Sequence, residues 1–424
     1  MENPYLSATN MNNILIWSIS FLAIAGVIIR PFKVTEAVYA VIGAALLFLF
    51  QLITFSDAFS GIAKGLDVYL FLTGMMLLAE TAREEKLFDW LAAHATLRAR
   101  GSSGRLFLLI YLVGVVVTAF LSNDATAVVL TPAVAAAVKA AKVEKPLPYL
   151  LICAFIANAA SFILPISNPA NLVIYGTHMP SLIHWLSLYF IPSIVAITVT
   201  YFMLRFSQRE CFKQKIRTEI VLPELSPGGK TALIGICGTA AVLLVASAFN
   251  IELGLPTLIT GVATSAIVLA SARKNPVNVI KGISWAVLPL VAGLFVVVEA
   301  LNKTGMTQHL SALLNDVIAQ SETAAVWLSG TVTAVACNLM NNLPAGLIAG
   351  SVLQNAHTPD MVKSAVLIGV DLGPNLSITG SLATILWLVA LRREGQEVSA
   401  WTFLKLGSVI MTTALIAAIL SLWI

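Results

Sequence analysis

Apolar segments of about twenty residues recur along the whole chain, and each is long enough for a helix that crosses a bilayer. We predict ten crossings, at 13–29, 35–54, 66–82, 148–175 (broken), 184–206, 231–249, 255–272, 284–302, 361–391 (broken) and 401–423. Charged residues make up only 11% of the 424 residues, too few to cover the surface of a soluble protein. The sequence therefore excludes a soluble enzyme, a disordered protein and a secreted disulfide scaffold. It predicts an all-α polytopic membrane protein.

Two further apolar stretches, 104–141 and 324–356, have polar residues at their centres. The interrupting residues are Ser122, Asn123 and Asp124 in the first stretch and Asn338, Asn341 and Asn342 in the second. Each stretch fits either a re-entrant hairpin, which enters and leaves on one side, or two full spans. Irregular backbone at membrane depth persists only where protein surrounds it or where it lines a wet cavity.

Lysine and arginine are distributed unevenly between the two sides that the ten spans define. With both stretches as hairpins and the N-terminus outside, Lys64, Lys303 and Lys363 lie on the outer side and the other 22 of the 25 basic residues are cytoplasmic. Basic residues accumulate on the cytoplasmic side of membrane proteins. The sequence thus predicts a cell (inner or plasma) membrane protein with both termini outside. The first apolar run lacks a basic leader and a cleavage site, so we interpret it as a span.

The polar, basic segment 207–230 is the expected cytoplasmic linker between two similar halves, 1–206 and 231–424. Matched positions lie at nearly constant offsets: Gly74/Gly293 and Glu80/Glu299 at 219, Asn123/Asn341 at 218, and Asn158/Asp371, Asn168/Ser381 and Asn171/Thr384 at 213. Each half has five spans and one hairpin, and an odd number of spans places the second half upside down. Inverted repeats with helices broken at the midplane are typical of secondary transporters, which bind their solutes there.

Asparagine, serine and threonine residues cluster at the hairpin centres and at the breaks. We predict that twelve of them bind the solute: Ser122, Asn123, Thr126, Asn158, Ser167, Asn168, Asn171, Asn338, Asn341, Asn342, Ser381 and Thr384. Nearby prolines and glycines interrupt helical hydrogen bonds, and broken helix ends present partial charges. Amide and hydroxyl groups both donate and accept hydrogen bonds. The pattern favours a neutral pocket for a small polyhydroxy solute or a dehydrated ion, with helix capping and helix–helix contact as the alternative role.

Four acidic residues fall within apolar segments, where a carboxylate is costly and marks a functional candidate. Asp124 and Asp371 belong to the polar clusters, and we predict that they couple transport to protons. Glu80 and Glu299 lie at span ends on opposite sides, a position more typical of interfacial residues. The predicted cavity segments contain no lysine or arginine, although helix N-termini can also attract anions.

Motifs of enzymes and metal sites are missing from the sequence. The four cysteines form no C-x-x-C pair, so a structural zinc site is not expected. There is no H-E-x-x-H, catalytic dyad or nucleotide-binding loop. We therefore predict a protein that is not an enzyme, with no metal, no cofactor and no nucleic-acid partner.

Three motifs of this chain resemble the ArsB family of arsenite and antimonite efflux permeases, in the ion transporter superfamily. They are Ser122-Asn123-Asp124 with Thr131-Pro132, Met340 to Pro344, and Gly369 to Leu388. The resemblance implies export of trivalent arsenic and antimony hydroxides, driven by the proton gradient or the membrane potential. It also implies, as an optional partner, a cytoplasmic ArsA-type ATPase.

Two departures leave alternatives open. The first break reads Ser167-Asn168-Pro169, where the family is expected to have an aliphatic pair after Ser-Asn, so the extra proline can reshape that half of the pocket. The superfamily also contains Na⁺/H⁺ antiporters and dicarboxylate or citrate carriers. Asp124 stands where those carriers have Thr, which weakens the carboxylate interpretation. Arsenous acid, largely neutral near pH 7 and bearing three hydroxyls, suits an amide- and hydroxyl-rich pocket.

Overall fold

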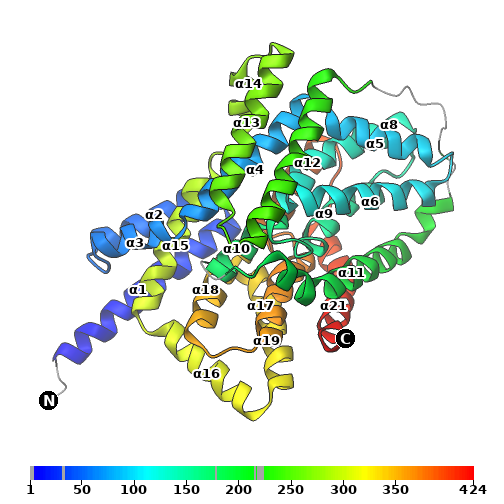
Figure 1. Ribbon diagram of the computed structural model, residues 1–424. Helices are drawn as coiled ribbons and strands as arrows, with labels where there is room; N and C mark the ends of the chain where they lie inside the picture. Colours follow the sequence, from blue (N-terminus) through cyan, green and yellow to red (C-terminus); the bar gives the residue numbers. More distant parts are fainter. Residues whose placement is uncertain (1–3, 31–33, 177–178, 214–215, 217–223) are drawn as a thin grey trace.

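The computed structural model describes residues 4–30, 34–176, 179–213, 216 and 224–424, and every regular element in these ranges is a helix (Figure 1). The first half has α1 (Pro4–Ile29), α2 (Glu36–Leu49), α3 (Phe55–Lys64), α4 (Leu66–Glu84), α5 (Leu87–Arg98), α6 (Ser103–Phe120), α7 (Asn123–Ala125), a π-helical turn (Thr126–Leu130), α8 (Thr131–Ala140), α9 (Leu147–Ala159), α10 (Pro169–Tyr175) and α11 (Leu182–Ser207). The predicted all-α class is confirmed.

The second half follows the same order of long and short helices. It has α12 (Pro227–Ala248), α13 (Gly254–Ala272), α14 (Pro276–Gly282), α15 (Val287–Lys303), α16 (Met306–Gln320), α17 (Glu322–Met340), α18 (Asn342–Asn355), α19 (Asp360–Leu372), α20 (Leu382–Arg393) and α21 (Ala400–Leu420). A short helix precedes α4 and another precedes α15, and a broken pair of helices comes before α11 and before α21.

Eight helices of the described chain are long and apolar enough to cross a membrane, or nine if α3 and α4, which meet at 46°, form one span. This agrees with a multi-pass membrane protein. Helices α2 and α9 have only 14 and 13 residues, about 20 Å of helix, and do not cross a bilayer alone. The count of ten spans, their inverted relation and the placement of the termini stay predictions.

Both predicted breaks are present. Helix α9 ends at Ala159 and α10 begins at Pro169, while α19 ends at Leu372 and α20 begins at Leu382. Pro165 and Pro374 lie between the paired helices in short 3₁₀ turns, where the missing N–H of proline breaks no α-helical bond. Pro169 is the first residue of α10, a position that proline favours. The extra proline is therefore accommodated as a helix start.

Each of the two polar-centred stretches has a break between helices at its predicted interruption, and the choice between a re-entrant hairpin and two spans stays a prediction. Helix α6 ends at Phe120 and the chain resumes in α7, while α17 ends at Met340 and α18 starts at Asn342. Asn341, at the second turn, has φ of +73°, a backbone region that is strained for residues other than glycine and is often found at functional sites.

Glycines bring the two halves into close contact. Helix α4 packs on α13, where Gly74 lies directly against Gly261 and the Thr257 carbonyl. Helix α15 packs on α2 in the same manner, with Gly293 against Ala40. Small residues of this kind let membrane helices approach closely. The matched glycines of the sequence repeat thus occupy equivalent helix crossings.

The segment predicted as a linker is partly helical at its end. Helix α12 begins at Pro227, because Ser226 caps it by accepting a hydrogen bond from the Gly229 amide at 2.9 Å. Gly228 and Gly229 pack closely against Glu85, so these glycines serve contact rather than flexibility. Positions 214–215 and 217–223 of the predicted linker lie outside the described residues.

Candidate functional site

Four helices begin at polar caps that the sequence marked as site residues. Ser122 caps α7, Asn168 caps α10, Asn341 caps α18 and Ser381 caps α20. Helix α7 packs against α20, and α10 packs against α18, so each hairpin tip of one half meets a half-helix of the other. Helix N-termini carry partial positive charge and free N–H groups, which favour oxygen-bearing ligands.

Asn158 joins the two broken spans through its side chain. Its amide nitrogen donates to Asn375 Oδ1 at 3.0 Å and to Thr384 Oγ1 at 3.2 Å. Its amide oxygen accepts from Ser381 Oγ at 3.1 Å. Asn375 in turn donates to the Phe155 carbonyl at 3.0 Å. All of these side chains are buried, so the predicted solute ligands here also bind one another.

In the predicted repeat, the contact between Asp371 and Asn168 corresponds to the contact between Asn158 and Ser381. Asn158 matches Asp371 and Ser381 matches Asn168. The pair Asn158–Ser381 is therefore the counterpart of the pair Asp371–Asn168, in which Asn168 Nδ2 donates to Asp371 Oδ1. The two halves meet through the same pair of positions, once as amide and hydroxyl and once as carboxyl and amide.

The second oxygen of Asp371, Oδ2, is buried and accepts no hydrogen bond from the described residues. The Ser161 hydroxyl lies near this carboxyl, but it donates to the Asn158 carbonyl at 2.7 Å. Asp371 itself is 1% exposed. A buried oxygen without a donor is costly as part of a carboxylate, and a proton or a bound solute would satisfy it.

Other predicted site residues hold the first break and the first hairpin together. Asn171 Nδ2 donates to the Ser161 carbonyl at 2.9 Å and more weakly to those of Leu164 and Pro165. Ser167 donates to the Ala119 carbonyl at 3.0 Å. The remaining contacts are Thr126 with Thr118 at 2.8 Å and Asn123 Oδ1 with the Asp124 amide at 2.9 Å.

The second tip is joined to the second break in a related way. Asn338 donates to the Gly373 carbonyl at 2.9 Å and accepts from Ser377 Oγ at 2.6 Å. Asn341 donates to the Thr379 carbonyl at 3.3 Å. Asn342, the first residue of α18, is 3% exposed. The assignment of all these residues to solute binding stays a prediction.

Asp124 and Ser122 face open space. They line a cavity of about 60 Å³ together with Glu80 of α4, Pro169 of α10 and residues 282–284. We call this space the first cavity. A water molecule needs about 10–15 Å³ of such volume, so the cavity holds a solute of only a few heavy atoms. Its titratable lining residues, Glu80 and Asp124, are both acidic.

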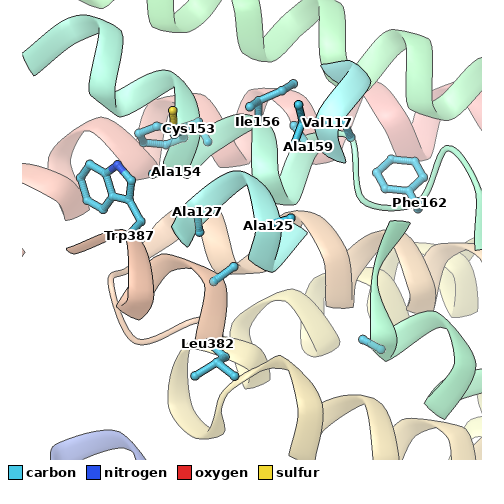
Figure 2. Packing of buried hydrophobic residues seen from close by; sticks show 14 of the residues in the cluster. Val117, Ala125, Ala127, Cys153, Ala154, Ile156, Ala159, Phe162, Leu382 and Trp387 are labelled. Atoms are coloured by element: carbon cyan, nitrogen blue, oxygen red, sulfur yellow. The ribbon is translucent and has the colours of Figure 1, made fainter. Parts of the chain in front are cut away.

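Apolar residues enclose the polar crossing. In Figure 2, Ala125 and Ala127 of the first tip lie between Cys153 and Ile156 of α9 and Leu382 of α20, and the contacts between these elements agree. Cys153 and Cys337 are fully buried in this apolar core. Within the described residues, no three histidine, cysteine or acidic side chains are grouped to hold a metal.

Asn375 and Glu80 are absent from the residues that the sequence assigned to the site. Asn375 follows Gly373 and Pro374 and has no polar counterpart at the repeat offset, so its contact with Asn158 was not foreseen. Glu80 was interpreted as interfacial, which stays a prediction; within the chain it is 6% exposed and lines the first cavity. The sequence signal that could have added Glu80 to the site is the acidic residue Glu299 at the matched position of the repeat.

A family model described as a citrate transporter matches residues 21–372. The arsenical pump membrane protein of Yersinia enterocolitica is 30% identical over 340 residues, which cover 78% of this chain and 79% of the relative. The chain belongs to the ArsB/CitMHS family of ion transporters. The resemblance that the tip and break motifs predicted is thereby confirmed.

Further members and one solved structure extend the comparison. The arsenical pump membrane protein of Escherichia coli is 29% identical over 344 residues, 78% of this chain and 79% of the relative. An uncharacterized transporter of Mycobacterium tuberculosis is 26% identical over 96% of this chain and 97% of its own. The crystal structure of the Alcanivorax borkumensis YdaH transporter, at 16% identity, has a TM-score of 0.58 and covers 89% of this chain and 88% of its own. This last likeness concerns the fold of the family.

Proposed function

We propose that this protein is a secondary transporter that exports trivalent metalloid hydroxides, arsenite and antimonite, from the cytoplasm in exchange for protons. The membrane potential contributes to the driving force. In the predicted orientation the first cavity opens toward the cytoplasm, because Arg83 and Lys281 lie beside it on the side where basic residues accumulate.

The lining of the first cavity carries this proposal. Ser122 and the cap of α7 offer hydroxyl and amide groups, the space fits only a few heavy atoms, and the charged lining residues are acidic. Arsenous acid is small, neutral and rich in hydroxyls, so it can exchange its water for such groups. The printed names of the arsenical pump relatives support the same solute.

Proton coupling is assigned to Asp124 and Asp371. Asp124 faces the cavity, where it can exchange a proton with water. Asp371 is enclosed between the two broken spans, with Oδ2 unpaired among the described residues. Because an unpaired buried charge is costly, a proton on Asp371 can move with the site from one side to the other.

A carboxylate carrier is the second candidate, favoured by the citrate-transporter description of the matching family model. The acidic first cavity opposes it, because Asp124 and the carboxylate end of the Glu80–Arg83 ion pair line the cavity and would repel a citrate anion. An ArsA-type ATPase belongs to the arsenite proposal as an optional partner.

Everted membrane vesicles test the solute and the coupling together. We expect arsenite to accumulate in energised vesicles that contain the protein and to leave again when a protonophore is added. Sodium-dependent proton movement without arsenite accumulation would instead indicate a Na⁺/H⁺ antiporter, and citrate uptake would indicate the carboxylate carrier.

The variant Asp124→Asn separates binding from coupling at the cavity. It should abolish or uncouple accumulation in protein that is still folded in the membrane. Asp89→Asn, on α5 and outside the cavity lining, is the matched control and should transport normally. Full proton-driven accumulation by Asp124→Asn would refute the role of Asp124.

A further inference from the structure

A second cavity lies across α10 from the first. The first cavity contacts Pro169 at the start of α10, and the second, of about 440 Å³, contacts Leu172, Val173 and Gly176 toward its end. Helices α4 and α15 line both cavities but in opposite directions. The first cavity meets the late part of α4 and the start of α15, and the second meets Val68 near the start of α4 and the late part of α15.

One carboxylate lines each cavity at a matched position of the repeat. Glu80 lines the first cavity and Glu299 lines the second, at the repeat offset of 219. Each packs against a glycine of a short helix from the other half. Gly282 of α14 lies against the carboxylate of Glu80, so a side chain there would crowd the carboxylate, whereas Gly61 of α3 lies against the Cβ of Glu299.

Each carboxylate is held by one cation and keeps acceptor capacity. Arg83 Nε donates to Glu80 Oε2 at 2.8 Å and Arg83 Nη2 to Glu80 Oε1 at 2.5 Å. Lys64 Nζ donates to Glu299 Oε2 at 2.7 Å. A carboxylate accepts about four hydrogen bonds, so the cation fixes its orientation while the remaining lone pairs are free for the cavity.

Burial strengthens the electrostatic interaction of these carboxylates with a solute in the cavity. The side chain of Glu80 is 8% exposed and that of Glu299 is 16% exposed, so water screens their charge less than it would on an open surface. A neutral solute with hydroxyl groups can donate to the free lone pairs. At the first cavity Glu80 lines the wall and its partner Arg83 does not, so an anion meets the negative end of the ion pair. At the second cavity Lys64 lines the wall together with Glu299, so both charges of that ion pair face the cavity.

We propose that Glu80 is a specificity-determining residue of the first cavity that admits neutral hydroxyl-bearing solutes and repels anions, and that Glu299, paired with Lys64 on the wall of the second cavity, is its counterpart for binding neutral solutes there. The admission of solute rests on the proposed function, whereas the exclusion of anions can be measured without transport.

Thiol labelling measures anion exclusion directly. In a background without the four native cysteines, Ser284→Cys reports on the first cavity and Ser351→Cys on the second, because both serines line their cavities. The rates of modification by an anionic sulfonate reagent and a cationic ammonium reagent are compared. Adding Glu80→Gln should raise the anionic-to-cationic rate ratio at position 284 by about tenfold and leave position 351 unchanged. Glu299→Gln should do the reverse.

Glu84→Gln is the matched control for the first cavity. Glu84 also pairs with Arg83, at 3.0 Å, but it does not line the cavity. It should leave both ratios unchanged. The double variant Glu80→Gln/Arg83→Gln leaves no unpaired buried charge and should fold, and it should still raise the ratio because Glu80 lines the cavity and Arg83 does not. Equal ratios in the Glu80 and Glu84 variants would overturn the proposal.

Transport separates this inference from the proposed function. In everted vesicles Glu80→Gln should raise the KM for arsenite about tenfold, with the maximal rate unchanged, and should make uptake sensitive to citrate. Arsenite transport by the unaltered protein with no such change in Glu80→Gln would refute the specificity role of Glu80 alone. Absence of arsenite transport by the unaltered protein would refute the proposed function, and the labelling ratios would still decide whether Glu80 excludes anions from the first cavity.

Discussion

The variant Asp371→Asn tests proton coupling with little disturbance of the fold. Asparagine has nearly the same shape as aspartate, and its oxygen can still accept from Asn168. Its amide nitrogen can take the place of Oδ2, which accepts nothing from the described residues. Removing a buried charge is often neutral or stabilising. We therefore expect the melting temperature of the purified variant to equal or exceed that of the unaltered protein.

The expected loss follows from the single carboxyl at this position. One proton that moves with each neutral solute contributes about 2.3 kcal/mol for each 100 mV of membrane potential. This corresponds to roughly a 50-fold concentration ratio, because 1.4 kcal/mol is a factor of ten. Asp371→Asn should lower the steady-state ratio in everted vesicles to about one. Exchange of labelled for unlabelled arsenite, which needs no gradient, should continue.

Asp360→Asn is the control, since Asp360 is the first residue of the same helix, α19, and its side chain is 50% exposed. This variant should accumulate arsenite normally. Accumulation by Asp371→Asn at the unaltered level, abolished by a protonophore, would refute the reasoning. Loss of exchange as well as accumulation would assign Asp371 to solute binding rather than to coupling.

Three further outcomes can be checked. Asn158→Ala removes three side-chain hydrogen bonds between the broken spans and should lower the free energy of unfolding by about 2 kcal/mol. A double-mutant cycle with Asn375→Ala should give a coupling energy of about 0.6 kcal/mol. Additive losses of stability in that cycle would contradict the contact between Asn158 and Asn375. Gly74→Ala would drive a methyl group into the Thr257 carbonyl and should lower the free energy of unfolding by about 1–3 kcal/mol. Gly238 has open space around it, so the control Gly238→Ala should leave stability unchanged. Equal melting temperatures of the two variants would refute the close packing of α4 on α13 at Gly74. Replacing all four cysteines with serine or alanine should leave substantial arsenite transport, and complete loss in folded protein would indicate thiolate binding.

Local features of the fold could be predicted because they depend on short stretches of sequence. The breaks after Ala159 and Leu372 follow from proline and glycine within apolar runs. Both hairpin turns follow from polar residues in the same setting. The helix starts at Asn168 and Ser381 coincide with predicted site residues because the side chains that cap a helix are also those that bind polar solutes.

Contacts between the halves could not be predicted in the same way. The repeat pairs Asn158 with Asp371, but repeat-related positions are equivalents and need not touch. The actual side-chain partners of Asn158 are Asn375, Thr384 and Ser381, which are 217, 226 and 223 residues away. The burial of Glu80 could not be predicted for a similar reason, since it depends on α14 of the other half.

The predicted repeat also places the two acids proposed for coupling in different surroundings. Asp124 occupies the hairpin tip of the first half, where the second half has Asn342, and Asp371 occupies the broken span of the second half, where the first half has Asn158. Each matched pair therefore combines one carboxyl with one amide. The carboxyl of the tip faces the first cavity, while the carboxyl of the break is enclosed at the crossing. A symmetric protein would place both acids in equivalent surroundings. Here the asymmetry sets one acid at a cavity and encloses the other, and this difference supports the proposal that the two acids act at different steps of a coupled exchange.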